Sequence, residues 1–197
     1  MGRWSVAPAA HSHLEALIML VADEAAWSVR PARATELRRI AEIEREAGAR
    51  FDDLPALAGL PEVLAPPDAV AAALARGHLW VAAVTTSDAP VGFAYADVVD
   101  GALHLEELDV VPRWGRRGIG AALVAAVIAA ARREGLAAVT LTTFRDVPWN
   151  APFYARLGFR VLPPAALSPG LVALLAAEDA RGLPRALRVA MRRDVET

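Results

Sequence analysis

A glycine-rich turn at residues 115–120 is the best candidate in the sequence for binding a phosphate. It reads Gly-Arg-Arg-Gly-Ile-Gly between a predicted strand and a predicted helix, where free backbone N–H groups and the helix dipole favour an anion. Arg116 and Arg117 add positive charge. A dinucleotide fingerprint would need a further Gly at Leu123, and a P-loop would need Lys, which the chain lacks. The turn therefore predicts a phosphate site of another kind, with a plain chain reversal as the alternative.

The segment 103–111 offers a pair of proton-transfer groups. Its apolar residues predict a strand, whose period of two puts His104 and Glu106 on one face and Glu107 and Asp109 on the other. Two titratable side chains on one face can share a proton path, which suits general base catalysis. Polar residues on a half-solvated face of an antiparallel sheet would show the same pattern. Both interpretations stay open at this point.

A third group of interest lies near residue 150. Pro148 predicts the first turn of a short helix, which Gly158 ends before a strand at Phe159. Asn150 and Tyr154 are four residues apart in this helix, so we expect them on one face. The pair is a candidate contribution to a site, and a packed core aromatic is the alternative interpretation of Tyr154.

From residue 103 to residue 159, the order of elements and residues resembles the GNAT superfamily of N-acetyltransferases. The family signature is Gln/Arg-x-x-Gly-x-Gly/Ala after a strand that ends in an aliphatic residue near a Pro. Gly115 stands where the family has Gln or Arg, so that side chain is missing here. The segment 150–159 is similar to the Asn…Tyr…Gly-Phe segment of the family. The matching positions of the turn are Val110, Pro112, Gly118 and Gly120.

This resemblance implies an acetyl-CoA-dependent N-acetyltransferase, in which an amine attacks the thioester directly and no metal is required. It makes Tyr154 the general acid for the CoA sulfur, while His104 and Glu106 are the candidates for the general base. The backbone at 116–121 would bind the CoA pyrophosphate, and the strand near Val110 would polarise the thioester carbonyl. The expected cofactor-binding residues are Leu108, Asp109, Val110, Arg116, Arg117, Gly118, Ile119, Gly120, Ala121, Asn150 and Tyr154.

The acceptor is expected to be a small molecule or a peptide with a primary amine. Two stretches are rich in side chains that can line a cleft, one after the first predicted helix and one after the predicted strand 137–143. A catalytically weak acyl-CoA-binding module that regulates a partner is the alternative function. The candidate acceptor-binding residues are Arg50, Phe51, Phe144, Arg145 and Trp149.

The elements that must position these residues follow from hydrophobic periodicity and from Gly and Pro positions. Strand 103–111, helix 119–134 and strand 137–143 form a strand-helix-strand unit, so the two strands are predicted to be parallel. The expected fold is α/β of the α+β type, with a mixed, mostly antiparallel sheet of six to seven strands flanked by helices. The other expected strands are 27–30, 78–85, 90–99, 159–162 and 186–192, and the other expected helices are 35–48, 68–76, 148–157 and 169–181.

Length and composition set the remaining expectations. A chain of 197 residues with 55% apolar content predicts one domain at 25–197, after an extension at 1–24 for which helical and disordered states both stay open. The 21 Arg and 23 acidic residues nearly cancel, so no nucleic-acid substrate is expected. The absence of Cys excludes thiolate catalysis. No apolar stretch reaches the roughly 18 to 20 residues of a membrane span, so we expect a cytoplasmic protein, and a homodimer is compatible with these features.

Overall fold

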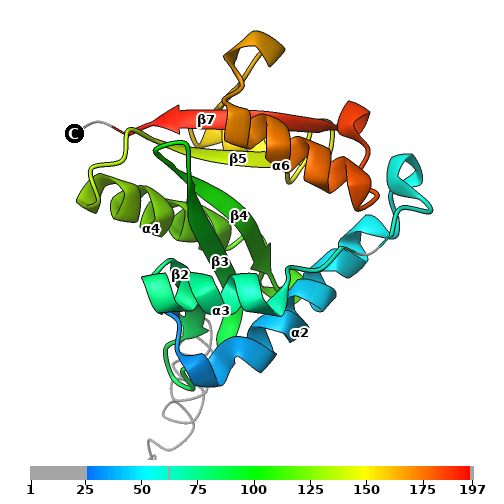
Figure 1. The fold of residues 1–197 in the computed structure, drawn as a ribbon. Coiled ribbons are helices and arrows are strands. Elements are labelled where there is room, and N and C mark those ends of the chain that lie inside the picture. The colour runs from blue at the N-terminus through cyan, green and yellow to red at the C-terminus, as the bar shows by residue number, and fades with distance from the viewer. Residues whose placement is uncertain (1–25, 62, 196–197) are drawn as a thin grey trace, which may run out of the picture.

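The computed structural model describes residues 26–61 and 63–195, so the extension expected at 1–24 lies outside the described residues. Within these two stretches, no helix combines the length and the apolar character needed to cross a membrane. The strands are β1 (Trp27–Pro31), β2 (Leu79–Val84), β3 (Pro90–Val99), β4 (Ala102–Val110), β5 (Ala138–Phe144), β6 (Arg160–Val161) and β7 (Arg188–Asp194) (Figure 1). The α-helices are α2 (Leu37–Gly48), α3 (Pro67–Arg76), α4 (Ile119–Arg133), α5 (Ala151–Arg156) and α6 (Pro169–Ala180).

The described strands form one seven-stranded sheet in the order β1-β2-β3-β4-β5-β7-β6. All neighbours are antiparallel except β4 and β5, which are parallel. A parallel pair needs a long crossover connection, and α4 with its flanking turns provides it. The predicted mixed sheet with one parallel pair is therefore confirmed.

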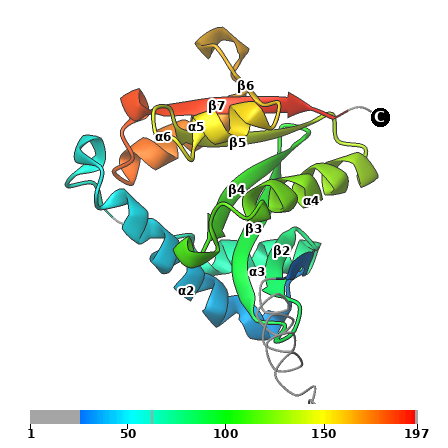
Figure 2. The ribbon, with the colours of Figure 1, turned by 180° about the vertical axis from the view of Figure 1, so that it is seen from behind.

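Helices cover both faces of this sheet (Figures 1 and 2). The helices α2, α3 and α6 lie on one face, and α4 and α5 lie on the other. The sequence of α2 shows why it packs there, because Ile40, Ile43 and Ala47 recur at spacings of three and four and are all buried, whereas Arg38 is exposed. Ile40 and Ile43 belong to the same core cluster as Phe93 of β3.

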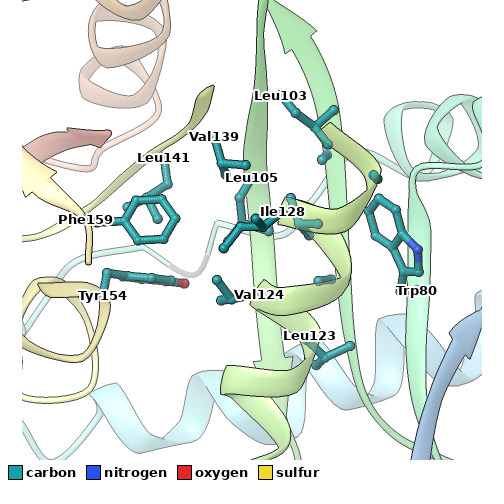
Figure 3. Close-up of a cluster of buried hydrophobic side chains, with 14 of the residues drawn as sticks. Trp80, Leu103, Leu105, Leu123, Val124, Ile128, Val139, Leu141, Tyr154 and Phe159 are labelled. Carbon is teal, nitrogen blue, oxygen red and sulfur yellow. The ribbon is translucent and has the colours of Figure 1, made fainter. Parts of the chain in front are cut away.

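The larger core lies between the sheet and α4 (Figure 3). Leu103 and Leu105 of β4 pack in the same cluster as Val124 of α4, while Tyr154 and Phe159 close the cluster on the side of α5. Each fully buried aliphatic side chain of this kind contributes about 1.5 to 3 kcal/mol to stability. The core therefore fixes α4 on β4, and with it the glycine-rich turn at the start of α4.

The parallel strands β4 and β5 stay paired over a short stretch only. Leu103–Leu105 pair with Val139–Leu141, and the two strands then diverge into a fork (Figure 2). β4 continues to Val110 with β3 on its other edge. Among the described strands, residues 106–110 have no partner on the side of β5. The fork therefore leaves part of a strand edge free to bind something else.

The helix α5 begins later than the sequence predicts. Its first residue is Ala151 and its N-cap is Asn150, so the expected start at Pro148 is wrong. Pro152 occupies one of the first two helical positions instead, where a residue without an N–H group loses no intrahelical bond. The backbone carbonyl of Asn150 accepts a hydrogen bond from the N–H of Tyr154 at 3.1 Å. Asn150 therefore stands at the helix end and Tyr154 lies one turn inside the helix.

Candidate active site

A β-bulge interrupts β4 at Glu106. Leu105 pairs with Ala96 of β3, and Glu107 already pairs with the preceding β3 residue, Tyr95, so Glu106 has no partner position of its own. An extra residue of this kind bends the strand and shifts the alternation of its side chains by one position. The period of two therefore fails between the two halves of β4.

The bulge changes which side chains share a face. Leu105 and Leu108 both belong to the core under α4, although three positions separate them. Glu107 and Asp109 are therefore on the opposite face, where Asp109 pairs with Phe93 in the core under α2. His104 precedes Leu105 in the strand and therefore also points away from α4, to the same face as Glu107 and Asp109. The expectation that Glu107 and Asp109 lie on the face opposite to His104 was wrong.

His104 lies in the protein interior. Its side chain is 1% exposed, and its Nδ1 shares a hydrogen bond of 2.9 Å with the hydroxyl of Thr140, which lies opposite on β5. Burial, followed by the nearby Arg188, lowers the pKa of His104 to about 4, so the imidazole is neutral at physiological pH. His104 does not line a cavity with Glu106. The structure thus does not bring the predicted base pair together.

A cavity of about 1270 Å³ fills the fork between β4 and β5. It extends from the glycine-rich turn and α5 to the C-terminal end of α2 and the loop that follows. Three of the predicted site residues, His104, Arg117 and Arg145, are not among the lining residues. The predicted residues that do line it are Arg50, Phe51, Glu106, Leu108, Asp109, Val110, Arg116, Gly118, Ile119, Gly120, Ala121, Phe144, Trp149, Asn150 and Tyr154.

The glycine-rich turn presents free backbone donors to this cavity. Arg116 has a φ of 62° and Gly118, the N-cap of α4, has a φ of 81°, so the chain passes through two left-handed positions before the helix. The first backbone bond of the helix reaches the carbonyl of Gly118 at 3.0 Å. The N–H groups at 119–121 precede it and have no partner within the helix. Together with the helix dipole these N–H groups suit an anion.

Arg117 packs against the turn instead of lining the cavity. Its guanidinium carbon lies 4.7 Å from the centre of the Trp114 ring, which is a cation–π contact. Arg116 lines the cavity and is the side chain of the turn available to a phosphate. The two arginines, which the sequence does not distinguish, therefore have different surroundings.

Gly120 leaves room that a side chain would fill. A Cβ atom at this position would lie 3.2 Å from Cζ of Phe153 and 3.6 Å from Cδ2 of Leu108. The start of α4 therefore approaches α5 and β4 closely, with no space for a branched side chain. The free donors, the close approach and the open edge of β4 together suit an elongated phosphate-bearing ligand such as CoA.

Tyr154 and Asn150 form the wall of the cavity at α5. The Tyr154 ring packs between Phe153 and Phe159, with ring centres 5.0 and 5.8 Å away, and its hydroxyl points towards α4 (Figure 3). Tyr154 is thus a core aromatic and a cavity residue at once. The side chain of Asn150 donates from Nδ2 to Thr143 Oγ1 at 2.7 Å, while its buried Oδ1 has no partner among the described residues.

Two carboxylates act on Tyr154 across the cavity. Burial, followed by the Glu44 carboxylate, raises the pKa of Glu107 to about 7. Burial and the charge of Glu107 also raise the pKa of Asp109. Burial raises the pKa of the Tyr154 hydroxyl, and the charges of Glu107 and Asp109 raise it further. At neutral pH the cavity therefore holds a protonated phenol and carboxyl groups whose pKa values are raised.

Glu106 belongs to a different set of charges. Burial, followed by Asp97 and Glu178, raises the pKa of Glu106 to about 7. These two residues and Arg181 line a smaller neighbouring cavity of about 210 Å³, which Glu106 also lines. Tyr154 lines only the larger cavity. Glu106 and Glu107 both line both cavities, and Glu107 is the glutamate whose charge acts on Tyr154.

Aromatic residues from two distant segments form the other end of the large cavity. The Phe51 ring lies 5.7 Å from that of Phe144 and 5.8 Å from that of Trp149, measured between ring centres. The guanidinium carbon of Arg50 lies 4.4 Å from the centre of the Trp149 ring. Four of the five predicted acceptor-binding residues therefore meet, and the fifth, Arg145, is exposed outside the cavity.

A buried ion pair near this end is not evident from the sequence. Arg188 of β7 donates from Nη2 and Nε to Glu178 of α6 at 2.8 and 3.1 Å, and Thr142 donates to the same carboxylate. The guanidinium of Arg188 also lies 5.0 Å from the centre of the Phe144 ring. An Arg and a Glu ten residues apart in different elements give no local signal, so only the packing of α6 on β7 reveals the pair.

Comparison with known proteins identifies the family of this chain. Residues 40–159 match the acetyltransferase (GNAT) family, which is more than half of the chain. The chain belongs to this GNAT family of N-acetyltransferases, as the glycine-rich turn and the segment around Tyr154 indicate. The family uses acetyl-CoA as its acyl donor.

Solved structures share the fold at low sequence identity. N-acetylglutamate synthase from Neisseria gonorrhoeae, complexed with coenzyme A and N-acetyl-glutamate, is 16% identical with a TM-score of 0.64 over 87% of this chain, which spans only 36% of that longer protein. PaiA N-acetyltransferase from Thermoplasma acidophilum, in complex with coenzyme A, is 14% identical with a TM-score of 0.60, over 86% of this chain and 99% of that one. The ribosomal-protein-S18-alanine N-acetyltransferase of Escherichia coli is 16% identical with a TM-score of 0.58, over 87% of this chain and 96% of that one.

Proposed function

We propose that this acetyltransferase transfers the acetyl group to the primary amine of a small molecule or peptide by direct attack, with Glu107 as general base and Tyr154 as general acid. The observation that carries the proposal is that both side chains line one cavity and that the charge of Glu107 acts on the Tyr154 hydroxyl. An amine arrives mostly protonated at neutral pH, so its transfer needs a base, and the departing thiolate needs an acid.

The residues of the fork suit acetyl-CoA, which supplies an acetyl group activated as a thioester. The N–H groups at 119–121 and the Arg116 side chain would hold the pyrophosphate. The free edge of β4 at Leu108–Val110 would pair with the amide-bearing arm and polarise the thioester carbonyl. The absence of a side chain at Gly120 keeps this path open next to Phe153.

Each proton in the reaction has a defined place. The Glu107 carboxylate takes a proton from the ammonium of the acceptor, and the free amine nitrogen then attacks the thioester carbonyl carbon. Glu107 passes this first proton to water. As the new C–N bond forms and the C–S bond breaks, the nitrogen loses its second proton to the carboxylate so restored. Tyr154 donates its phenolic proton to the sulfur. The raised pKa of Tyr154 keeps that proton in place until the thiolate forms.

Glu107 is the preferred base over the two candidates taken from the sequence. His104 is buried and bonded to Thr140, away from the cavity. Glu106 and Glu107 both line both cavities, but the charges that act on Glu106 are those of Asp97, Glu178 and Arg181. A pKa of about 7 suits a general base at neutral pH, and both glutamates have it. Of the two, Glu107 is the one whose charge acts on the Tyr154 hydroxyl.

A free-thiol release assay tests this function. Acetyl-CoA is offered with a panel of amino acids, polyamines, aminoglycosides and peptide N-termini, and the release of CoA thiol is measured for the wild-type protein and for the matched variants Glu107→Gln and Glu106→Gln. We expect amine-dependent release that Glu107→Gln lowers by about 10²- to 10⁴-fold and Glu106→Gln lowers far less. Saturable CoA binding without release by any amine would instead support an acyl-CoA-binding regulatory module.

A further inference from the structure

The acceptor end of the cavity holds the guanidinium of Arg50. Among the residues described in the structure, none places a carboxylate within ion-pair distance of Arg50, which is exposed and lies over Trp149. Arg188, the other arginine near the aromatic residues, is bonded to Glu178 by two nitrogens. Arg50 is therefore the cation at this end whose hydrogen-bond donors are available to a ligand.

The stacking of Arg50 fixes where its charge lies. Trp149 is held against Phe51, and Phe51 against Phe144, so the indole is part of a wall formed by two distant segments. A guanidinium lying on such a ring loses fewer conformations when it binds a carboxylate than a free side chain would. The same wall gives an apolar surface beside the charge.

Carboxylates also line this cavity. Glu107 and Asp109 line it from β4, and Glu44 lines it from α2. A carboxylate on the acceptor would be repelled by these groups and attracted by Arg50, whereas an ammonium would have the reverse preference. A ligand with both groups is therefore oriented, with its amine towards Glu107.

On the basis of the proposed function, we propose that Arg50 binds a carboxylate of the acceptor, which makes the acceptor an amine that also carries a carboxylate, such as an amino acid or a short peptide. Arg50 is then a specificity-determining residue, and the aromatic wall of Phe51, Phe144 and Trp149 packs against the apolar part of the acceptor.

The test compares acceptors that differ in the carboxylate alone. Thiol release with acetyl-CoA is measured for L-phenylalanine, L-phenylalaninamide and phenethylamine, and for glycyl-L-phenylalanine and its amide as the peptide pair. The proteins are the wild type, Arg50→Gln, and Arg45→Gln as a matched control. Arg45 lines the same cavity but its guanidinium donates to the backbone carbonyl of Ala41 at 3.3 Å and does not contact Trp149.

We expect the wild type to prefer one of the carboxylates over its amide by about 10- to 100-fold in kcat/KM, the range of a charge-assisted hydrogen bond. Arg50→Gln should remove this preference through KM, while kcat and the Arg45→Gln protein stay close to wild type. Equal use of acid and amide by the wild type, or an equal loss for both in Arg50→Gln, would overturn the proposal.

A binding measurement separates this proposal from the proposed function. Calorimetry in the presence of CoA measures the binding of N-acetyl-L-phenylalanine, of N-acetyl-glycyl-L-phenylalanine and of the amides of both. The proteins are the wild type and Arg50→Gln, and the measurement needs no turnover. Tighter binding of an acid that depends on Arg50 supports the carboxylate site even where no amine releases thiol. Thiol release with amines, together with equal binding of acid and amide, would leave the transferase in place and refute the role of Arg50.

Discussion

Replacing Glu107 with Gln removes a carboxylate whose ionised form is unfavourable in the folded protein. Burial, followed by the Glu44 carboxylate, raises the pKa of Glu107 from 4.5 to about 7. The folded state therefore holds the proton more tightly than the unfolded state, and the wild type loses stability as the pH rises from about 4.5 through about 7. Gln keeps the shape and the amide oxygen but does not titrate. The variant should thus be more stable than the wild type at high pH.

The size of this gain follows from the change in pKa. At 1.36 kcal/mol per pH unit, a rise from 4.5 to about 7 corresponds to at most about 3 kcal/mol at pH 8. Neighbouring carboxylates share part of it, so about 1 to 3 kcal/mol is the expected range. For a protein of this size, each kcal/mol raises Tm by about 2 to 4 °C. We expect Glu107→Gln to raise Tm by about 2 to 12 °C at pH 8.

Thermal unfolding at pH 5 and pH 8, followed by circular dichroism, measures this effect. The difference between variant and wild type should shrink towards zero at pH 5, and the same variant should lose turnover. Glu106→Gln is the control, because its carboxyl group has a similarly raised pKa, so it should gain stability without a comparable loss of turnover. A Glu107→Gln protein less stable than wild type at pH 8, or equally shifted at both pH values, would refute this reasoning.

Three further predictions concern the pH profile, the cofactor path and the buried ion pair. Wild-type kcat/KM should rise with pH through about 7 as Glu107 ionises, and a profile flat from pH 5 to 8 would argue against this base. Gly120→Val should meet Phe153, cost about 1 to 3 kcal/mol and weaken CoA binding at least about tenfold by calorimetry; unchanged binding would exclude the close approach. Arg188→Met should leave Glu178 unpaired and lower the free energy of unfolding by about 3 to 5 kcal/mol, measured with denaturant. The double variant Arg188→Met/Glu178→Leu should recover this stability, and a sum of the two single losses in the double variant would contradict the pairing.

The sequence predicts those parts of the site that depend on neighbours along the chain. The turn before α4 follows from its glycines, because Gly118 adopts a φ that other residues avoid. The parallel strands follow from the length of the connecting helix. Arg50 and Trp149 were expected near the acceptor because their stretches are rich in side chains that can line a cleft, and the two residues do meet.

The parts that depend on partners across the sheet could not be predicted. The bulge at Glu106 arises from the pairing of β4 with Tyr95 and Ala96 of β3, which a single strand's periodicity does not contain. That bulge is why Glu107 was missed as a candidate base. His104 is buried because it meets Thr140 across a parallel pair, and its polar side chain gives no sign of this in the sequence.

The most direct test of the proton path is Tyr154→Phe. This variant keeps the ring between Phe153 and Phe159 and removes only the hydroxyl. The measurement is the rate of CoA thiol release at saturating acetyl-CoA and amine, with the Kd for CoA from calorimetry as the second readout. We predict that kcat falls by about 10²-fold or more while the Kd for CoA changes less than about twofold. Unchanged turnover would contradict the role of Tyr154 as the acid that protonates the thiolate.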